Sequence, residues 1–469
     1  MKRLVAVACL SLAVAGLFAR FSAAAFTGST AVPSNSVTVD ALHNYFSVTP
    51  GSAVQPGTST AVASGNVDSL SLDFGTVPST RTFTSVFTIK NVSSATKTAT
   101  LSLSNVPQVA SVAFASSGGT SVTLGAGAST TLTVVTSSTV AGRGTGTLRL
   151  GLSGVSWMYR DYSFHIDEAP EAPTAPAATQ KPAGRLDLSW TASTTVTNLA
   201  GYDLYRSAGG GAYTKLNSSP LTGTAYSDTA TVDGTSYTYK LKAVSSGSPV
   251  LTSVDSTTVT ATADATPPGA PTTIALANGG GAGNGYVNAG NATSLSISIT
   301  LPSSSLATDS VKLTVSNGGS SATTTHAGTA GTGTITVTAN VAALGDGTLT
   351  LSANSTDLAG NVSGTTTVTV TKDTVAPAAP SGNYTDNNNT ADQVGGTAEA
   401  NASITVTKTS PAPTQTFTTS ANGSGAYSVA VATTNGKNNT PISVTYTVTA
   451  TDAAGNTSAA TTITFNDVR

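Results

Sequence analysis

Short segments in which apolar and polar residues alternate recur along the chain and constrain its fold more than any other feature. Clear examples are residues 295–299 (LSISI), 311–315 (VKLTV) and 335–338 (ITVT). This period of two places Val, Ile or Leu on one face of a strand and Ser, Thr or Lys on the other. No stretch after the first 25 residues carries apolar residues at helical spacing over three turns. The sequence therefore predicts an all-β protein without any helix longer than about two turns.

Clusters of Gly, Pro, Asn and Asp separate these strands at short intervals, which is typical of immunoglobulin-like β-sandwiches. The sequence DATPPGAP at 264–271 recurs as DTVAPAAP at 373–380. A similar proline-rich stretch contains Pro170, Pro173 and Pro176. Proline favours extended structure in the residue before it, so we interpret these stretches as short, stiff junctions between domains.

The junctions predict a tandem of sandwich domains in an elongated array. The predicted parts are a signal peptide at 1–25, a poorly defined N-terminal segment at 26–68, and four sandwich domains at 69–169, 170–264, 265–374 and 375–469.

The first residues have the order of a secretory signal peptide. Two basic residues precede an apolar run at 4–18, and small residues allow cleavage after Ala24 or Ala25. A retained signal anchor is the alternative, but Arg20 interrupts the apolar run before the roughly 20 residues that a bilayer requires. We therefore expect a secreted, extracellular or cell-surface protein that does not insert into the membrane after cleavage.

Composition argues against several classes of protein. The one cysteine, Cys9, lies within the predicted signal peptide, so the cleaved chain has no thiol for a disulfide or a zinc site. Charged residues make up 9% of the chain and its formal net charge is −2, which provides no basic surface for nucleic acid. Domains of ordinary size, stabilised by apolar packing alone, are expected.

A second motif repeats in the last two predicted domains. The sequence DLAGNVS at 357–363 matches DAAGNTS at 452–458, each between two alternating segments. Glycine adopts positive φ readily and Asp or Asn side chains bond to turn backbone, so a hairpin loop accounts for the motif. A calcium site is the alternative, although one carboxylate and one amide per loop fall short of about six to eight oxygen ligands. Its candidate ligands are Asp357, Asn361, Asp452 and Asn456. No other cofactor is indicated.

These turns and proline junctions resemble the bacterial Ig-like domains of large adhesins and biofilm-matrix proteins. Residues 396–406 (GTAEANASITV) are similar to the first hairpin of those repeats, although the family usually has a glycine where Asn401 stands. Residues 72–77 (LDFGTV) and 83–91 (FTSVFTIKN) resemble Ig-like modules of the ASH and choice-of-anchor type. The N-terminal sequence, FTGS at 26–29 and NSVTV at 35–39, is similar to that of camelysin and TasA-type secreted proteins.

Residues 170–264 resemble a bacterial fibronectin type III domain throughout. The matching sequences are LSW at 188–190, GYDLYRS at 201–207 and GTSYTYKLKA at 234–243. The resemblance implies that Trp190 is the core tryptophan and that Tyr237 is the tyrosine-corner residue, whose hydroxyl bonds back to the chain. A sugar-stacking role for Trp190 is the alternative.

Residues in the pattern of a catalytic site are missing from the sequence. His43, His165 and His326 lie in three different segments, and no GxSxG motif supplies a nucleophile. His165 falls in an alternating segment, where we expect a solvated strand residue. Acidic residues are scattered at turns and junctions instead of forming the facing pair that a glycosidase uses. We therefore predict that the chain is not an enzyme.

The sequence favours a secreted or cell-surface protein with a structural or adhesive role. Its expected partners are the cell surface, the extracellular matrix or a polysaccharide. The alternative is an accessory polysaccharide-binding protein associated with extracellular glycoside hydrolysis, because fibronectin modules of this bacterial type often accompany secreted glycoside hydrolases.

Overall fold

A computed structural model describes residues 31–32, 35–36, 42–326, 331, 333–387, 390–432 and 442–467. The predicted signal peptide, residues 1–25, lies outside the described residues. The described residues form strands and loops with two short 3₁₀ helices, η2 (Leu42–Asn44) and η3 (Pro182–Gly184), and no α-helix. The all-β prediction is therefore confirmed for the part of the chain that the structure describes. Within that part, no helix has the length and apolar character needed to cross a membrane.

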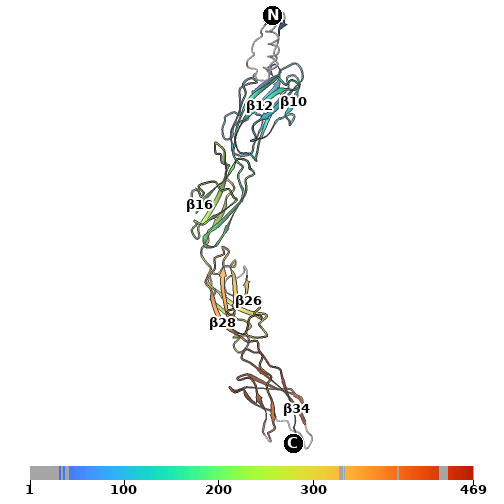
Figure 1. Ribbon diagram of the computed structural model, residues 1–469, viewed down its shortest axis with the longest axis vertical. Helices are drawn as coiled ribbons and strands as arrows, with labels where there is room; N and C mark the ends of the chain where they lie inside the picture. The colour runs from blue at the N-terminus through green and yellow to red at the C-terminus, as the bar shows by residue number, and fades with distance from the viewer. Residues whose placement is uncertain are drawn as a thin grey trace, which may run out of the picture. The chain divides into compact units, whose positions relative to one another are not determined.

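The chain divides into two compact units, and each contains two β-sandwiches (Figure 1). The first unit is Met1–Gln180 with Gly184–Asp264, and the second is Lys181–Ala183 with Ala265–Arg469. A two-stranded pair, β1 (Ala31–Val32) and β2 (Asn35–Ser36), precedes the first sandwich in the chain.

The first sandwich consists of a six-stranded sheet and a five-stranded sheet. The six strands lie in the order β10 (Ser121–Leu124), β8 (Lys97–Ser104), β12 (Gly142–Leu152), β13 (Tyr159–Glu168), β5 (Ser71–Val77) and β4 (Ala63–Ser64). The five strands are β3 (Phe46–Pro50), β7 (Phe87–Asn91), β11 (Ser129–Thr136) and β6 (Thr82–Phe83) in order, with β9 (Val109–Phe114) also paired to β11. Phe74 packs on Phe83 and Phe164 in the core, with ring centroids 4.9 and 4.8 Å apart.

Residues 42–68 are built into this sandwich. Strand β3 pairs with β7, and Leu42, Phe46 and Val48 are buried in the same core as Phe74. Burial of each such side chain stabilises the fold by roughly 1.5–3 kcal/mol. The predicted boundary between 26–68 and 69–169 therefore does not separate two domains, because the earlier segment supplies two strands of the first sandwich, β3 and β4.

The second sandwich has seven strands in two sheets. One sheet has the order β14 (Thr174–Gln180), β15 (Leu186–Thr191) and β18 (Ala225–Asp228), and the other has β17 (Thr214–Lys215), β16 (Leu199–Ala208), β19 (Ser236–Ser245) and β20 (Val259–Thr262). Its core contains Trp190, Tyr202, Tyr237 and Tyr239.

The third and fourth sandwiches make up the second unit. In the third, β21 (Thr273–Leu276), β23 (Leu295–Leu301) and β26 (Gly333–Ala339) face β22 (Tyr286–Val287), β28 (Thr366–Lys372), β27 (Gly347–Thr356), β24 (Ser310–Ser316) and β25 (Ser321–His326). In the fourth, β29 (Asn383–Thr385), β30 (Asp392–Thr397) and β33 (Ala426–Val431) face β32 (Gln415–Ser420), β31 (Ser403–Ser410), β34 (Ile442–Thr451) and β35 (Thr461–Asp467).

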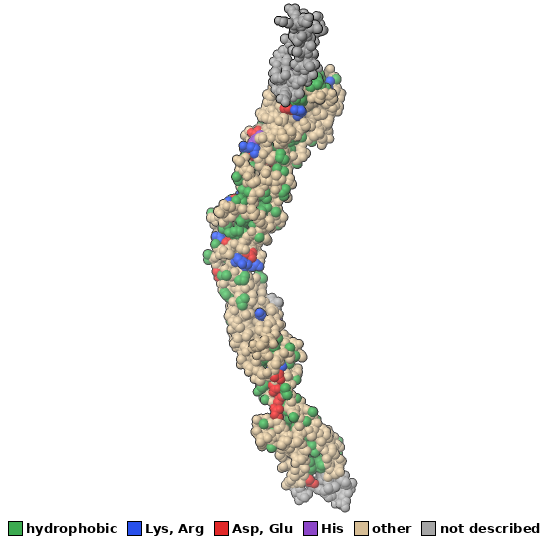
Figure 2. All heavy atoms as spheres, viewed as in Figure 1, with side chains coloured by type: hydrophobic (Ala, Val, Ile, Leu, Met, Phe, Trp, Pro, Cys, Tyr) green, Lys and Arg blue, Asp and Glu red, His purple; other side chains and the backbone are tan. Residues whose placement is uncertain are grey.

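Strand β23 shows how the alternating pattern forms these cores. Leu295, Ile297, Ile299 and Leu301 are buried, whereas the Ser and Thr residues between them are partly exposed. The same separation leaves a surface of mainly uncharged polar side chains and backbone, with charged side chains in small groups (Figure 2). Asn401 adopts a φ of 63°. Asparagine tolerates this left-handed region better than most residues.

Candidate functional site

The two repeated loops are hairpin turns closed by an aspartate and an asparagine. The loop between β34 and β35 has both carboxylate oxygens of Asp452 accepting hydrogen bonds at 2.8 Å, from the backbone N and from Nδ2 of Asn456. Gly455 adopts a φ of 91° between them. The side chains thus shape the turn, as the motif predicts.

The loop between β27 and β28 has the same construction. Asp357 Oδ1 accepts hydrogen bonds from the backbone N of Gly360 at 2.7 Å and of Asn361 at 2.8 Å. Its Oδ2 accepts one from Asn361 Nδ2 at 2.9 Å. The repetition of these bonds shows that the motif encodes one local structure in two domains.

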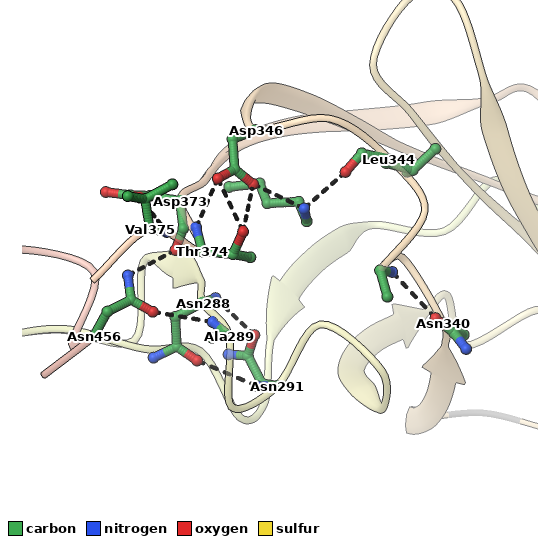
Figure 3. Close-up of polar contacts among 12 residues, drawn as sticks. Asn288, Ala289, Asn291, Asn340, Leu344, Asp346, Asp373, Thr374, Val375 and Asn456 are labelled. Carbon is green, nitrogen blue, oxygen red and sulfur yellow. Dashed lines mark hydrogen bonds and ion pairs between the residues drawn. The ribbon is translucent and has the colours of Figure 1, made fainter.

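Asn456 also contacts the preceding sandwich (Figure 3). Its Nδ2 donates to the carbonyl oxygen of Asp373 at 2.9 Å, and its Oδ1 accepts from the backbone N of Ala289 at 3.0 Å. Nearby, Asn288 Nδ2 donates to the carbonyl oxygen of Ala454 at 2.8 Å. Three hydrogen bonds therefore join a loop of the fourth sandwich to the end of the third. Asn456 is 6% exposed, so these bonds are largely shielded from water.

The segment that receives Asn456 is itself fixed by an ion pair (Figure 3). Lys372, which is buried at the end of β28, donates from Nζ to Asp346 Oδ1 at 2.8 Å and to the carbonyl oxygen of Leu344 at 2.7 Å. Asp346 Oδ2 accepts from the backbone N of Thr374 at 2.9 Å. Partial burial alone would raise the pKa of Asp346, but the hydrogen bonds from Lys372 and Thr374 hold that pKa below its usual value. Residues on both sides of Asp373 are thus anchored to the third sandwich.

Asn361 makes a corresponding contact within the second unit. Its Oδ1 accepts a hydrogen bond from the backbone N of Ala183 at 2.9 Å. In both loops the aspartate closes the turn, and the asparagine bonds to residues distant in sequence.

The oxygens of the candidate calcium ligands already have N–H partners. Each carboxylate oxygen of Asp357 and Asp452 accepts at least one hydrogen bond from the loop, and the amide oxygens of Asn361 and Asn456 accept from Ala183 and Ala289. Over the described residues, no three His, Cys, Asp or Glu side chains are grouped so that they could hold a metal ion. The geometry is that of a turn and a junction, because calcium prefers six to eight oxygens aimed at one point.

The two residues assigned through the fibronectin resemblance lie inside the second sandwich. Trp190 is 6% exposed and meets Tyr202 edge-on, with centroids 5.7 Å apart, so it packs in the core and does not face solvent. The hydroxyl of Tyr237 accepts a hydrogen bond from the backbone N of Val232 at 2.8 Å. This bond back to the chain is the arrangement of a tyrosine corner.

His165 lies on β13 and its ring nitrogens contact two carboxylates. Nδ1 is 2.8 Å from Asp73 Oδ1, on the neighbouring strand β5, and Nε2 is 3.5 Å from Asp167 Oδ1. Partial burial alone would raise the pKa of Asp73, but hydrogen bonds from His165 and Gly75 hold it below its usual value. The histidine thus links two strands at a partly exposed position. His43 pairs with a different carboxylate, that of Asp68, at 3.5 Å.

Hydrogen bonds also join the two sandwiches of the first unit. Thr195 Oγ1 donates to the carbonyl oxygen of Ser138 at 3.0 Å, and Asn198 Nδ2 donates to that of Ala141 at 2.9 Å. The backbone N of Thr197 donates to the carbonyl oxygen of Thr139 at 3.0 Å. Sequence reasoning located the prolines near this junction but missed these contacts, since Ser, Thr and Asn are common throughout the chain.

Comparison with known proteins matches parts of the chain to a protein family and to a curated protein. Residues 376–467 match the family described as a bacterial Ig domain. A segment of 106 residues is 35% identical to chitinase A1 of Niallia circulans. The match covers 22% of this chain and 14% of the chitinase, so about a fifth of the chain is similar to a small part of that enzyme.

Similar solved structures include repeats of fibronectin and adhesin type. A Fn3-like protein from Clostridium thermocellum is 31% identical over 20% of this chain and 91% of its own, with a TM-score of 0.17. A 1.5-MDa bacterial ice-binding adhesin is 21% identical over 64% of this chain and the whole of the compared structure, with a TM-score of 0.25.

The family match and the four sandwiches agree on the kind of protein. The chain is a multi-domain protein of four immunoglobulin-like β-sandwiches, and residues 376–467, in the fourth of them, match the family described as a bacterial Ig domain.

Proposed function

We propose that the chain is a non-catalytic structural or adhesive protein, secreted or held at the bacterial cell surface, whose domains transmit force along the chain. The observation that carries this proposal is the Asn456 junction. A side chain that shapes a loop in one sandwich also bonds to two backbone groups of the sandwich before it. Such bonds restrict movement between neighbouring domains, which is useful in a spacer or matrix component and is not required for catalysis.

The small share of charged residues supports the same role. With 9% charged residues, the chain depends little on ion pairs that salt would screen. Its domains are held together mainly by apolar cores and by hydrogen bonds, which vary less with the ionic strength outside the cell.

The test is attachment and matrix formation by the producing bacterium. We expect deletion of the gene to reduce surface attachment or matrix cohesion, and the wild-type gene to restore it. Complementation with a gene that encodes Asn456→Ala should restore less attachment or cohesion than the wild-type gene does, when both proteins are exported in equal amounts. Unchanged attachment and cohesion after deletion would contradict the proposal, as would turnover of a glycoside, ester or peptide that one point mutation abolishes.

A second candidate function is accessory binding of polysaccharide next to a glycoside hydrolase. It is supported by the 106-residue match to a chitinase, 35% identical. A glycan array probed with the full chain separates the two functions, because a purely structural role predicts no saturable binding to any glycan.

A further inference from the structure

The outer face of the first sandwich carries a hollow over three adjacent strands. Gly151 on β12 pairs with Thr100 on β8 and with Tyr159 on β13, so it lies at the centre of the three. The cavity has a volume of about 250 Å³ and is open to solvent. Its walls include Thr100, Ser102, Arg149 and Tyr159 around Gly151.

The hollow depends on glycine at position 151. The φ of Gly151 is not in the left-handed region, so the backbone there is open to other residues. A Cβ at this position would lie 3.1 Å from Thr100 Oγ1 and 3.7 Å from the Cβ of Tyr159. A side chain larger than alanine would therefore project into the space between the two neighbouring strands and fill it.

One wall of the hollow is flat, polar and electrically balanced. The guanidinium carbon of Arg149 lies 3.7 Å from the centroid of the Tyr159 ring. Arg149 Nε and Nη2 donate to the two carboxylate oxygens of Asp161, each at 2.7 Å. The stacking and the bidentate pair fix the orientation of all three side chains. Because the arginine charge is already matched by Asp161, the wall favours a neutral ligand over an anion.

The rest of the cavity combines apolar and hydroxyl groups. Val155, which is half-buried, contributes apolar surface, and Thr100, Ser102 and Ser156 contribute hydroxyls. The hairpin that joins β12 to β13 also carries Trp157, which is 48% exposed. A pyranose ring has matching chemistry, with apolar C–H faces and a rim of hydroxyls. Binding pockets generally combine apolar contact with a few placed polar groups in this way.

We propose that this hollow binds one pyranose unit of a neutral glycan. The volume is below the roughly 300–1,000 Å³ of sites for drug-sized molecules, which limits the site to about one ring. Aromatic residues supply large contact area to such ligands, and the Tyr159 ring in the wall of the hollow is of this kind. A single shallow subsite implies weak binding, with a Kd of the order of 1 mM. This inference rests on the second candidate function, the accessory binding of polysaccharide, and its failure would leave the structural role of the Asn456 junction unaffected.

The experiment is saturation-transfer NMR on the full chain with cellohexaose, chitohexaose and maltohexaose, and with trigalacturonate as a charged comparison. We expect saturation transfer to at least one neutral oligosaccharide, and a weaker signal or none for trigalacturonate. Gly151→Val, which fills the hollow, should weaken binding at least tenfold. Thr147→Val is the matched control, since it adds no bulk to the cavity and lies on the same strand and face.

Far-ultraviolet circular dichroism and the unfolding midpoint establish whether each variant is folded. If Gly151→Val does not fold, Arg149→Ala tests the wall of the hollow and should lower glycan binding without filling the hollow. Absence of transfer to all three neutral oligosaccharides would overturn the proposal. The proposal would also be overturned if binding survived both Gly151→Val and Arg149→Ala, or if the chain preferred trigalacturonate.

Discussion

The side chain of Asn456 donates a hydrogen bond of 2.9 Å to the carbonyl oxygen of Asp373, which lies 83 residues earlier in the chain. The same side chain reaches Ala289 with its oxygen. Without it, the loop of the fourth sandwich would keep one bond to the third, from Asn288 to Ala454. The asparagine therefore contributes two of the three described side-chain bonds at this junction.

Asn456→Ala is expected to loosen the third sandwich from the fourth while both stay folded. Each lost hydrogen bond contributes about 1 kcal/mol, and more where a buried partner is left unsatisfied. Spin labels at Ser320→Cys and Thr418→Cys, in a Cys9→Ser background, should show a broader distance distribution in double electron–electron resonance. Asn340→Ala is the control, because Asn340 accepts from the backbone of Ala342 in its own domain. Distance distributions of equal width for Asn456→Ala and Asn340→Ala would mean that the Asn456 bonds do not hold the junction.

Trp190→Ala should destabilise the second sandwich by about 3 kcal/mol or more, because it removes a buried ring that packs on Tyr202. Tyr237→Phe should cost about 1 kcal/mol, since the ring remains and only the bond to Val232 is lost. Urea unfolding followed by circular dichroism measures both changes. Unchanged stability of Trp190→Ala together with lost glycan binding would instead assign Trp190 to a ligand site.

Glu168 makes the stability of the first sandwich depend on pH. Burial, aided by the nearby charge of Glu171, raises the pKa of Glu168 to about 9, although a hydrogen bond from Thr136 opposes the shift. The folded state therefore keeps a proton that the unfolded state releases above the ordinary glutamate pKa of 4.5. The contribution of protonated Glu168 to the free energy of unfolding is complete below pH 4.5. It is lost as the pH rises towards about 9, at up to about 1.4 kcal/mol per pH unit.

Glu168→Gln should remove this dependence, so its unfolding midpoint relative to that of the wild type should be higher at pH 8 than at pH 5. Thermal unfolding at several pH values, followed by the fluorescence of Trp157 in a Trp190→Phe background, reports on the first sandwich. Glu399→Gln, in the other unit, should leave that dependence unchanged. A pH profile identical in the wild type and Glu168→Gln would show that Glu168 is ionised in the fold.

Local features of the fold followed from the sequence, and long-range contacts did not. The alternation at 295–299 predicted β23, and the repeated Asp–Asn spacing predicted both hairpin loops, because each depends on neighbours within a few residues. The partners of Asn456 lie 83 and 167 residues away and depend on how two domains pack. The hollow at Gly151 depends on the register of three strands, and one glycine among the 46 in the chain carries no signal of it.

The junction at 373–380 allows the two sources of stiffness to be separated. The sequence attributes stiffness to Pro377 and Pro380, which restrict the backbone of the connecting segment. The structure adds the Asn456 bonds, which join the domains across that segment and hold them whether or not the segment itself is flexible. We therefore expect Pro377→Gly with Pro380→Gly to broaden the distance distribution between the same two labels less than Asn456→Ala does. Combining all three substitutions should broaden it most, because neither constraint would then remain. If the glycine pair alone gives the full width of the combined variant, the prolines and not the asparagine set the rigidity of this junction.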